Sequence, residues 1–285
     1  MEPLLPSSVP RRGGRWADHR TVINGVFFPT RTSLPWRDLP PVYGNWKTVY
    51  NRHRRWSLEG TWVNILDGHG PAVTRPRALT GQSAPTRPSP APTSTRPEPA
   101  THRQPMTPQG AASNDNNPGG REALGRSRGG LTTKIHLVAD RRCRPIARLA
   151  SPGQHGDSPR LIPLMNAVRI RRRGRGRPRT RPARAMADKA YSSRANRAWL
   201  RRRGIAAVIP IKEDQKANRR NKGRAGGRPP AFDAGRYKER NTVERCFHKL
   251  KGFRAVATRY DKRERIYQGT VDVASIRIWL RDPVT

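Results

Sequence analysis

The chain has 285 residues, and its 59 lysines and arginines against 20 aspartates and glutamates give a formal charge of +39. This length allows one or two domains. The cysteines, Cys143 and Cys246, form no pair with metal-ligand spacing, which argues against a disulfide scaffold or a zinc site. No apolar run reaches the roughly 18 residues that a membrane span needs, so no membrane partner is expected.

The positive charge predicts a polyanionic partner, because a compact isolated protein with this imbalance would repel itself. Most of the excess is arginine, which binds phosphate through a planar, two-pronged fork. DNA or RNA is therefore the expected partner, and each neutralised phosphate would also release a condensed counterion. High-GC coding is the alternative source of the arginines, but it accounts poorly for an imbalance of this size.

Residues 1–15 are predicted to form a disordered tail, and residues 16–66 a small helical domain. This domain holds five of the seven tryptophans: Trp16, Trp36, Trp46, Trp56 and Trp62. A basic helix is expected from about Trp46 to Trp56, with an outer face made of Lys47, Arg52, His53, Arg54 and Arg55. Short helices ending in a basic one are typical of a helix-turn-helix-like DNA reader. A small helical dimerisation module is the alternative.

Residues 67–123 have a different composition. Eleven of the 28 prolines lie between positions 68 and 120, and no Phe, Trp or Tyr occurs between Trp62 and Tyr191. Such a stretch buries too little apolar area to offset the entropy lost on ordering, so it is predicted to be disordered.

Residues 124–285 alternate strand and helix patterns, which predicts an α/β unit. The expected strands are 131–138, 145–149, 183–187 and 205–211. The expected helices are 158–168, 193–203, 237–251 and 266–280. Between them lie an arginine-rich loop over 169–184 and a basic, glycine-rich loop over 212–230. The arginine-rich loop is either solvated or in contact with phosphate.

A polar stripe marks the helix near the C-terminus. Tyr237, Arg240, Glu244 and Lys251 have offsets of 0, 3, 7 and 14, which keep them on one helical face. Asp188 follows a short apolar strand, where an α/β sheet presents functional groups. Two carboxylates reaching one crevice from a strand and a helix can hold a divalent metal, which activates water at a phosphodiester. The alternative for Glu244 is an ion pair with Arg240 or an interaction with His248.

The stripe, read as tyrosine, two residues, arginine, three residues, glutamate, six residues and lysine, resembles the signature of bacterial insertion-sequence DDE transposases of families four and five. Further segments are similar to that family. They are Arg31–Pro40, Asn45–Trp56, Gly125–Asp140, Gly153–Asp157 and Ala187–Ser193. The resemblance covers roughly residues 16–66 and 124–281.

The resemblance implies an RNase H-like mixed sheet flanked by helices, preceded by the helical DNA-binding domain with Lys47, Arg52, Arg54 and Arg55. It implies that Asp188 and Glu244 are catalytic metal ligands, and that Tyr237, Arg240 and Lys251 contact DNA. The expected cofactor is Mg²⁺ or Mn²⁺. The expected partners are double-stranded transposon ends and target DNA, bound by a homodimer in the bacterial cytoplasm, at the nucleoid.

The family also needs a first acidic residue, on a strand upstream of Gly125. Glu98 lies between two prolines and Asp115 lies in a turn sequence, so neither suits a central strand. Our hypothesis is that residues from about 68 to 120 are translated out of frame, between two compensating indels. The catalytic domain, 124–285, would then lack its first strand and one metal ligand. We expect little or no transposition, and a non-catalytic DNA-binding remnant is the alternative function.

Overall fold

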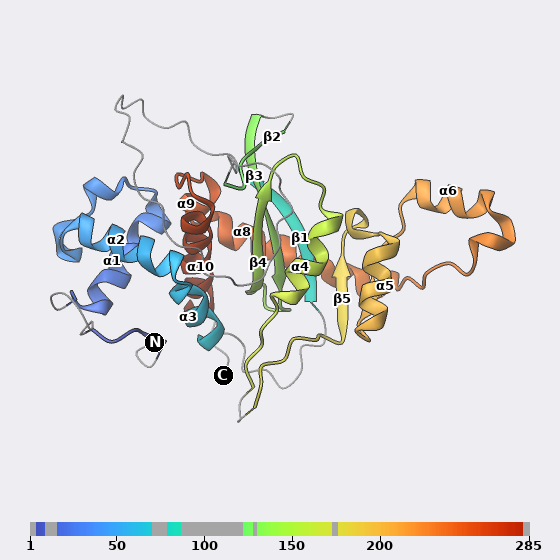
Figure 1. Ribbon diagram of the computed structural model, residues 1–285, viewed down its shortest axis with the longest axis horizontal. Helices are drawn as coiled ribbons and strands as arrows, with labels where there is room; N and C mark the ends of the chain where they lie inside the picture. Colours follow the sequence, from blue (N-terminus) through green and yellow to red (C-terminus); the bar gives the residue numbers. More distant parts are fainter. Residues whose placement is uncertain are drawn as a thin grey trace, which may run out of the picture.

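The computed structural model describes residues 4–8, 16–69, 79–86, 122–127, 130–172 and 176–281, with only the backbone path for 69, 79–86 and 127. In Figure 1 the helical N-terminal region lies at one end and a mixed sheet in the middle, with an arm projecting at the other end.

The N-terminal region is built from three α-helices: α1 (His19–Thr32), α2 (Trp46–Leu58) and α3 (Thr61–His69). Two short 3-10 helices, η2 (Trp36–Asp38) and η3 (Pro41–Tyr43), connect α1 to α2. The Asp18 and Asn45 side chains cap the starts of α1 and α2 by accepting backbone hydrogen bonds at 2.8 and 2.9 Å. Trp56 and Trp62 are fully buried and meet edge to face, with ring centroids 4.9 Å apart.

The sheet has three antiparallel strands followed by two parallel ones. In spatial order these are β4 (Pro145–Pro152), β3 (Gly130–Ala139), β1 (Leu79–Thr86), β5 (Arg184–Ala187) and β6 (Ala206–Val208). A short β2 (Gly125–Ser127) pairs with the start of β3. This is the mixed sheet expected of an RNase H-like fold, which confirms the predicted fold class.

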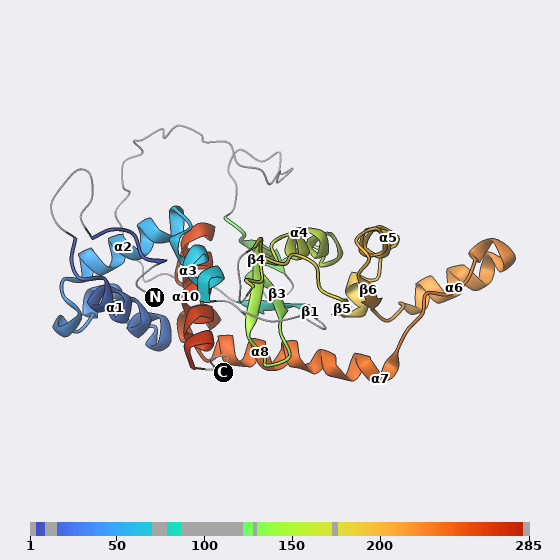
Figure 2. The same cartoon turned by 90° about the horizontal axis from the view of Figure 1, so that it is seen from below.

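Helices cover both faces of this sheet (Figure 2). On one face lie α4 (Leu161–Asn166), preceded by η4 (Ser158–Arg160), and α5 (Arg194–Arg202), which follows η5 (Lys189–Tyr191). On the other lies α8 (Asn241–Lys251), preceded by α7 (Ala234–Tyr237) and η7 (Lys238–Arg240). Strand β3 is buried on both sides because Leu137 packs with Val243 and Phe247 of α8, whereas Val138 packs in the other core.

Helix α10 (Glu264–Arg281) joins the N-terminal helices to the sheet, and the short α9 (Arg254–Ala257) precedes it. It packs against α1, α2, α3 and β4. Its residues Val273, Ile276 and Trp279 belong to the same hydrophobic core as Trp56 and Trp62. The two expected domains therefore share one continuous core.

Three expectations about organisation need correction. Residues 4–8 of the expected disordered tail are ordered, and Leu4 and Leu5 pack against the N-terminal core. The stretch expected to lack a strand contains β1, which pairs with β3 and β5 in the middle of the sheet. The loop expected over 212–230 contains α6 (Glu213–Asn221) and η6 (Gly223–Gly226).

In the part of the chain that the structure describes, no helix combines the length and the apolar character that crossing a membrane would require.

Candidate active site

Asp188 lies at the carboxyl end of β5, directly after the buried residues Ala185 to Ala187. Its side chain is 27% exposed, so solvent reaches the carboxylate. The Oδ1 atom accepts a hydrogen bond from Arg240 Nη1 at 2.5 Å and another from the Tyr237 hydroxyl at 3.3 Å. The strand end thus presents a carboxylate to the face of the sheet that α7 and α8 cover.

Glu244 lies in the first turn of α8, one helical turn after Arg240. Its Oε1 atom accepts a hydrogen bond from Arg240 Nη2 at 2.8 Å. The two guanidinium nitrogens of Arg240 therefore bind the two carboxylates at the same time. Because the guanidinium group is a rigid, planar fork, this contact holds the Asp188 and Glu244 carboxylates beside the same group.

Tyr237 packs against the sheet beside this pair, on Met186 of β5 and Val208 of β6. Burial raises the pKa of the phenol, the Arg240 charge lowers it, and the nearby Asp188 carboxylate raises it again. The hydroxyl therefore stays protonated and donates to Asp188. The Arg240 guanidinium also lies 5.4 Å from the centre of the tyrosine ring, which holds both groups in place.

Lys251, the fourth member of the polar stripe, is not brought to the carboxylates. It lies seven residues beyond Glu244 at the exposed end of α8, which is about 10 Å along the helix axis. Among the described residues its side chain has no hydrogen bond or ion pair. Tyr237 and Arg240 of the stripe bond to Asp188, Glu244 bonds to Arg240, and Lys251 adds a positive charge at the far end of α8.

Arg52 corrects the expected DNA-binding surface of the N-terminal region. Its side chain is buried, lies 4.0 Å over the Trp16 ring and donates to His19 Nδ1 at 2.9 Å. His53 is buried as well, with Nε2 3.2 Å from the Thr270 hydroxyl. The inner face of α2 consists of Val49, Arg52, His53 and Trp56, at offsets of 0, 3, 4 and 7. Lys47, Arg54 and Arg55 are exposed, as expected.

Gln82 lies on β1, the strand next to β5 in the sheet. The parallel pairing of β1 with β5 runs from Leu79 with Ala185 to Gly81 with Ala187. One residue further along the two strands come Gln82 and Asp188. Position 82 also pairs with Leu137 of β3, whose side chain packs against α8. A neutral residue therefore lies level with Asp188 at the centre of the sheet.

These residues offer an oxygen donor set for one divalent cation. Asp188 and Glu244 contribute carboxylate oxygens, the ligand type that Mg²⁺ prefers. Across the described ranges, no three or more His, Cys, Asp or Glu side chains gather as a potential metal cluster. The residues therefore fit one ion held by two carboxylates, and a pair of ions would need a further acidic group.

The strand order, with one carboxylate at the end of a central strand and another on a helix across the same face, defines the RNase H-like class of nucleic-acid-processing domains. Two family models match the chain. "Transposase DDE domain" matches residues 94–271, and "Putative transposase of IS4/5 family" matches residues 1–66. The chain belongs to the DDE transposases of the IS4/5 insertion-sequence family.

Curated relatives agree with this family. The chain is 31% identical over 151 residues to a Brucella ovis protein described as "Putative transposase for insertion sequence element IS6501", covering 53% of this chain and all of the relative. It is 33% identical over 135 residues to the corresponding IS402 protein of Burkholderia cepacia, covering 47% of this chain and 56% of the relative.

Among solved structures, a Mos1 transposase paired-end complex with the left transposon end is similar at 13% identity and a TM-score of 0.26. The match covers 95% of this chain and 65% of that one. A pre-cleavage Mos1 transpososome gives 13% identity and a TM-score of 0.25, over 96% of this chain and 80% of that one. These TM-scores are too low to inform the geometry of the site.

The two family matches also shorten the stretch that matches neither model of the family. The second match begins at residue 94, inside the stretch expected to be out of frame. Residues 67–93 lie between the two matches, and β1 falls within them.

Proposed function

We propose that the chain binds the DNA ends of its own insertion sequence, and that Asp188 and Glu244 form what it retains of a metal-dependent centre for strand cleavage and transfer. The observation that carries the proposal is the single guanidinium of Arg240 bonded to both carboxylates. In the presence of DNA the same fork has the geometry to bind a backbone phosphate instead. Release of the carboxylates would then make both available to a cation.

Membership of the family implies a divalent metal ion. Asp188 and Glu244 would hold it, and the ion would supply Lewis-acid activation of the attacking hydroxyl and charge neutralisation at the phosphodiester. Tyr237 positions Asp188 through its hydroxyl, and Arg240 orients both acids before the ion arrives. Mg²⁺ and Mn²⁺ both prefer such oxygen ligands.

We further propose that this centre is incomplete because Gln82 occupies the place of the family's first acidic residue. The support is its register, level with Asp188 on the adjacent parallel strand. An amide cannot contribute the negative charge that helps to hold two cations close together. Cleavage and strand transfer should therefore be severely reduced, whereas binding of duplex DNA by the basic surfaces should persist. A pair of copies, one on each transposon end at the nucleoid, remains our expectation for the assembly.

The test uses the full chain and a duplex that carries the ends of its own element, with Mg²⁺ or Mn²⁺. We expect the duplex to be bound and to remain nearly uncut. Failure to bind the end duplex in preference to a shuffled duplex would reject the proposed transposon-end function. Efficient nicking that is abolished by Glu244→Gln would reject the incomplete centre and leave the rest of the proposal intact.

A further inference from the structure

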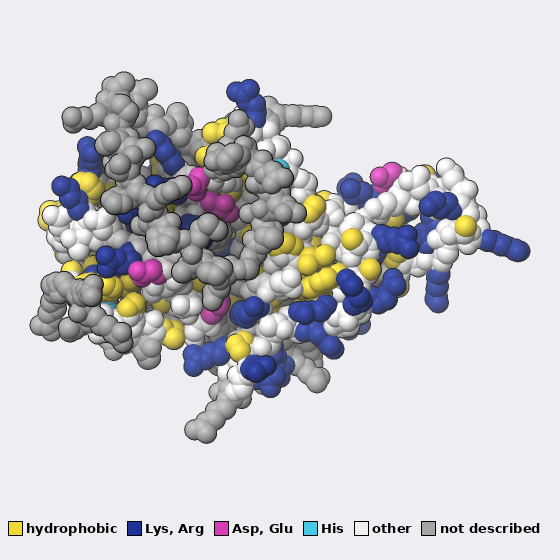
Figure 3. Space-filling model, in the orientation of Figure 1, with side chains coloured by type: hydrophobic (Ala, Val, Ile, Leu, Met, Phe, Trp, Pro, Cys, Tyr) yellow, Lys and Arg dark blue, Asp and Glu magenta, His cyan; other side chains and the backbone are white. Residues whose placement is uncertain are grey.

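A basic groove lies outside the carboxylate site, between α5, β6 and the projecting arm that contains α6 and η6. Its volume is about 1020 Å³. Figure 3 shows lysine and arginine side chains gathered over this end of the molecule. Of the lining residues within the described part of the chain, none is acidic, and the charged ones are Arg194, Arg197, Arg201, Arg219, Lys222 and Arg228.

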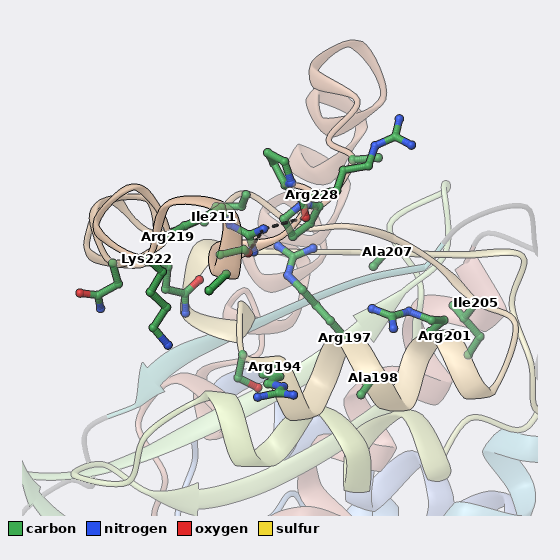
Figure 4. A pocket seen from close by; sticks show the side chains of 18 residues that line it. Arg194, Arg197, Ala198, Arg201, Ile205, Ala207, Ile211, Arg219, Lys222 and Arg228 are labelled. Atoms are coloured by element: carbon green, nitrogen blue, oxygen red, sulfur yellow. Dashed lines mark hydrogen bonds between the residues drawn. The ribbon is translucent and has the colours of Figure 1, made fainter.

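Two helical stripes face each other across the groove (Figure 4). One consists of Arg194, Arg197, Ala198 and Arg201 on α5, and the other of Gln215, Asn218, Arg219 and Lys222 along α6 and its C-cap. Both sets have offsets of 0, 3, 4 and 7, which is the spacing of one helical face. Each stripe is therefore the product of one regular helix.

The inner two cations hold the groove together. Arg197 donates to Ser192 Oγ at 3.1 Å and to the Ile209 carbonyl at 2.7 Å. Arg219 donates to the carbonyls of Gly226, Gly227 and Arg228 at 2.6 to 3.0 Å, which folds the arm back on itself. Burial lowers the pKa of Arg197, and the positive charge of Arg219 lowers it further.

The outer cations are free to meet a ligand. Arg194, Arg201, Lys222 and Arg228 are exposed, and within the described ranges their side chains make no hydrogen bond or ion pair. Two acids of the same region are paired locally, Glu213 with Lys216 at 2.7 Å and Asp233 with Arg236 at 2.8 Å, and a third, Asp214, accepts from the backbone N–H of Gln215. The groove thus carries an unbalanced positive charge that an anionic ligand would neutralise.

The side chains that line the groove favour duplex DNA over single-stranded nucleic acid. Among the residues that the structure describes, the lining contains no aromatic side chain on which an unpaired base could stack, and single-strand binders use such stacking platforms. Arginine and lysine side chains without aromatic neighbours are suited to phosphate contacts, and such contacts position a duplex without reading its sequence. Arg194 and Arg201 are seven residues apart, about 10 Å along α5, which corresponds to roughly three phosphates of one strand at about 3.4 Å of rise each along the duplex axis.

The groove is also connected to the carboxylate site. Gln215, on its α6 side, donates to the Ser192 carbonyl and accepts from the Ser192 hydroxyl. Ser192 follows Asp188 by four residues, at the end of η5. We propose that the groove binds the sugar-phosphate backbone of duplex DNA that flanks the strand held at Asp188 and Glu244. This inference rests on the proposed function, because it takes the DNA to enter at those carboxylates.

The experiment compares the full chain with a groove variant, Arg201→Gln, Lys222→Gln and Arg228→Gln. The control variant, Lys262→Gln, Arg263→Gln and Arg265→Gln, removes the same charge from exposed positions around the start of α10, which lies between the N-terminal helices and the sheet, away from the projecting arm (Figure 1). Affinity for a duplex of arbitrary sequence and for one of its separated strands is measured over a range of salt concentrations. A photo-crosslinking residue at Ala198, inside the groove, reports contact directly.

Each lost phosphate contact lowers the slope of log affinity against log salt by about 0.9. We expect the groove variant to lose a slope of about 2 to 3 on the duplex, the control variant to keep the wild-type slope, and position 198 to crosslink to duplex DNA. Equal slopes for the groove and control variants, or crosslinking to the single strand in preference to the duplex, would overturn the inference. If the wild-type chain bound no duplex at all, the proposed function itself would fail. If the wild-type chain bound the duplex but the groove and control variants had the same salt slope, only the inference about the groove would fail.

Discussion

Gln82 and Asp188 lie at the same level of two adjacent parallel strands, one residue beyond the paired Gly81 and Ala187. Position 82 pairs with Leu137, on the face that α8 covers, and position 83 pairs with His136, whose ring bonds to Tyr191 on the opposite face. Adjacent residues of one strand alternate between the faces of a sheet. Position 82 can therefore be used to test for an added carboxylate on the face that α8 covers, and position 83, on the opposite face, is the control.

Gln82→Asp should add a third carboxylate beside Asp188 and Glu244. We expect Mn²⁺ to bind about tenfold or more tightly, which corresponds to about 1.4 kcal/mol, and metal-dependent nicking of the end duplex to appear or to rise. Mn²⁺ titration by calorimetry and a nicking assay measure the two effects. Ser83→Asp adds the same charge at the neighbouring position and should do neither. Equal behaviour of the two variants would show that position 82 is not the place of the first acid.

The coding DNA provides an independent check of the out-of-frame hypothesis. Gly81 is encoded by GGN, where N is any nucleotide, and Gln82 by CAA or CAG. In the reading frame shifted forward by one nucleotide, the last two nucleotides of the Gly81 codon and the first of the Gln82 codon form the triplet GNC. The triplet GNC encodes aspartate only as GAC, which requires the Gly81 codon to be GGA. We expect that codon, an apolar strand in the same frame around it, and an indel on either side within residues 67–93, which lie between the two family matches. Any other glycine codon would remove the aspartate and contradict the hypothesis at this position.

Much of the α/β region was predictable because its elements carry clear periodic patterns. The expected strand over 131–138 is β3, the helix over 193–203 contains α5, and the helix over 266–280 lies within α10. The meeting of Asp188 with Tyr237, Arg240 and Glu244 could be anticipated because one helical face and one strand end are readable from spacing alone.

What was missed depends on partners distant in the sequence. Strand β1 has no alternating apolar pattern, and it is held by ladders to β3 and β5 on its two sides, a case where tertiary context overrides propensity. The inward position of Arg52 depends on Trp16 and His19, which lie more than 30 residues earlier. The α6 side of the groove was missed because residues 212–230 were predicted to form a basic, glycine-rich loop, and the facing arrangement of α5 and α6 required the fold.

Arg240→Gln should strengthen metal binding while weakening DNA binding. In the free protein the guanidinium occupies oxygens of both carboxylates and repels a cation electrostatically. Its removal should raise the Mn²⁺ affinity by about an order of magnitude, a change of about 1.4 kcal/mol. Arg245→Gln, an equal charge change at an exposed position of the same helix, is the control. A fall in Mn²⁺ affinity in Arg240→Gln, measured by calorimetry, would show that Arg240 supports the cation and does not compete with it.

Stability should fall as the pH falls from about 6.5 towards 4, because two buried histidines are neutral in the folded protein. Burial lowers the pKa of both His53 and His136 from 6.5 to about 4. Between these values the unfolded chain binds protons that the folded chain does not, so acid favours unfolding. Each histidine contributes on the order of 1 kcal/mol or more to this loss.

Thermal melts at pH 7 and pH 5 measure the effect. His136→Gln should melt lower at pH 7, because it disturbs the hydrogen bonds to Ser151 and Tyr191, but it should lose less stability between the two pH values than the wild type. His248→Gln alters an exposed histidine and should keep the wild-type difference. An unchanged pH dependence in His136→Gln would mean that His136 is already protonated, or titrates normally, in the folded state.

Gly269→Ala should weaken the packing between the N-terminal helices and α10. A Cβ atom at position 269 would lie 2.0 Å from Ser57 Oγ and 2.6 Å from Ser57 Cβ, closer than real atoms approach. Since Ser57 belongs to α2 and Gly269 to α10, the two helices would have to separate. We expect a loss of about 1 to 3 kcal/mol in unfolding free energy, as for other overpacked interfaces.

The double variant Ser57→Gly, Gly269→Ala tests the cause of that loss, because it removes both of the atoms that clash most closely. Glycine in a helix itself costs about 1 kcal/mol, so Ser57→Gly alone should be mildly destabilised. The coupling energy from the double-mutant cycle, measured by urea unfolding, should be stabilising and larger than about 0.5 kcal/mol. Additive losses would mean that α2 and α10 can shift apart freely, and that the shared core tolerates a wider spacing between them.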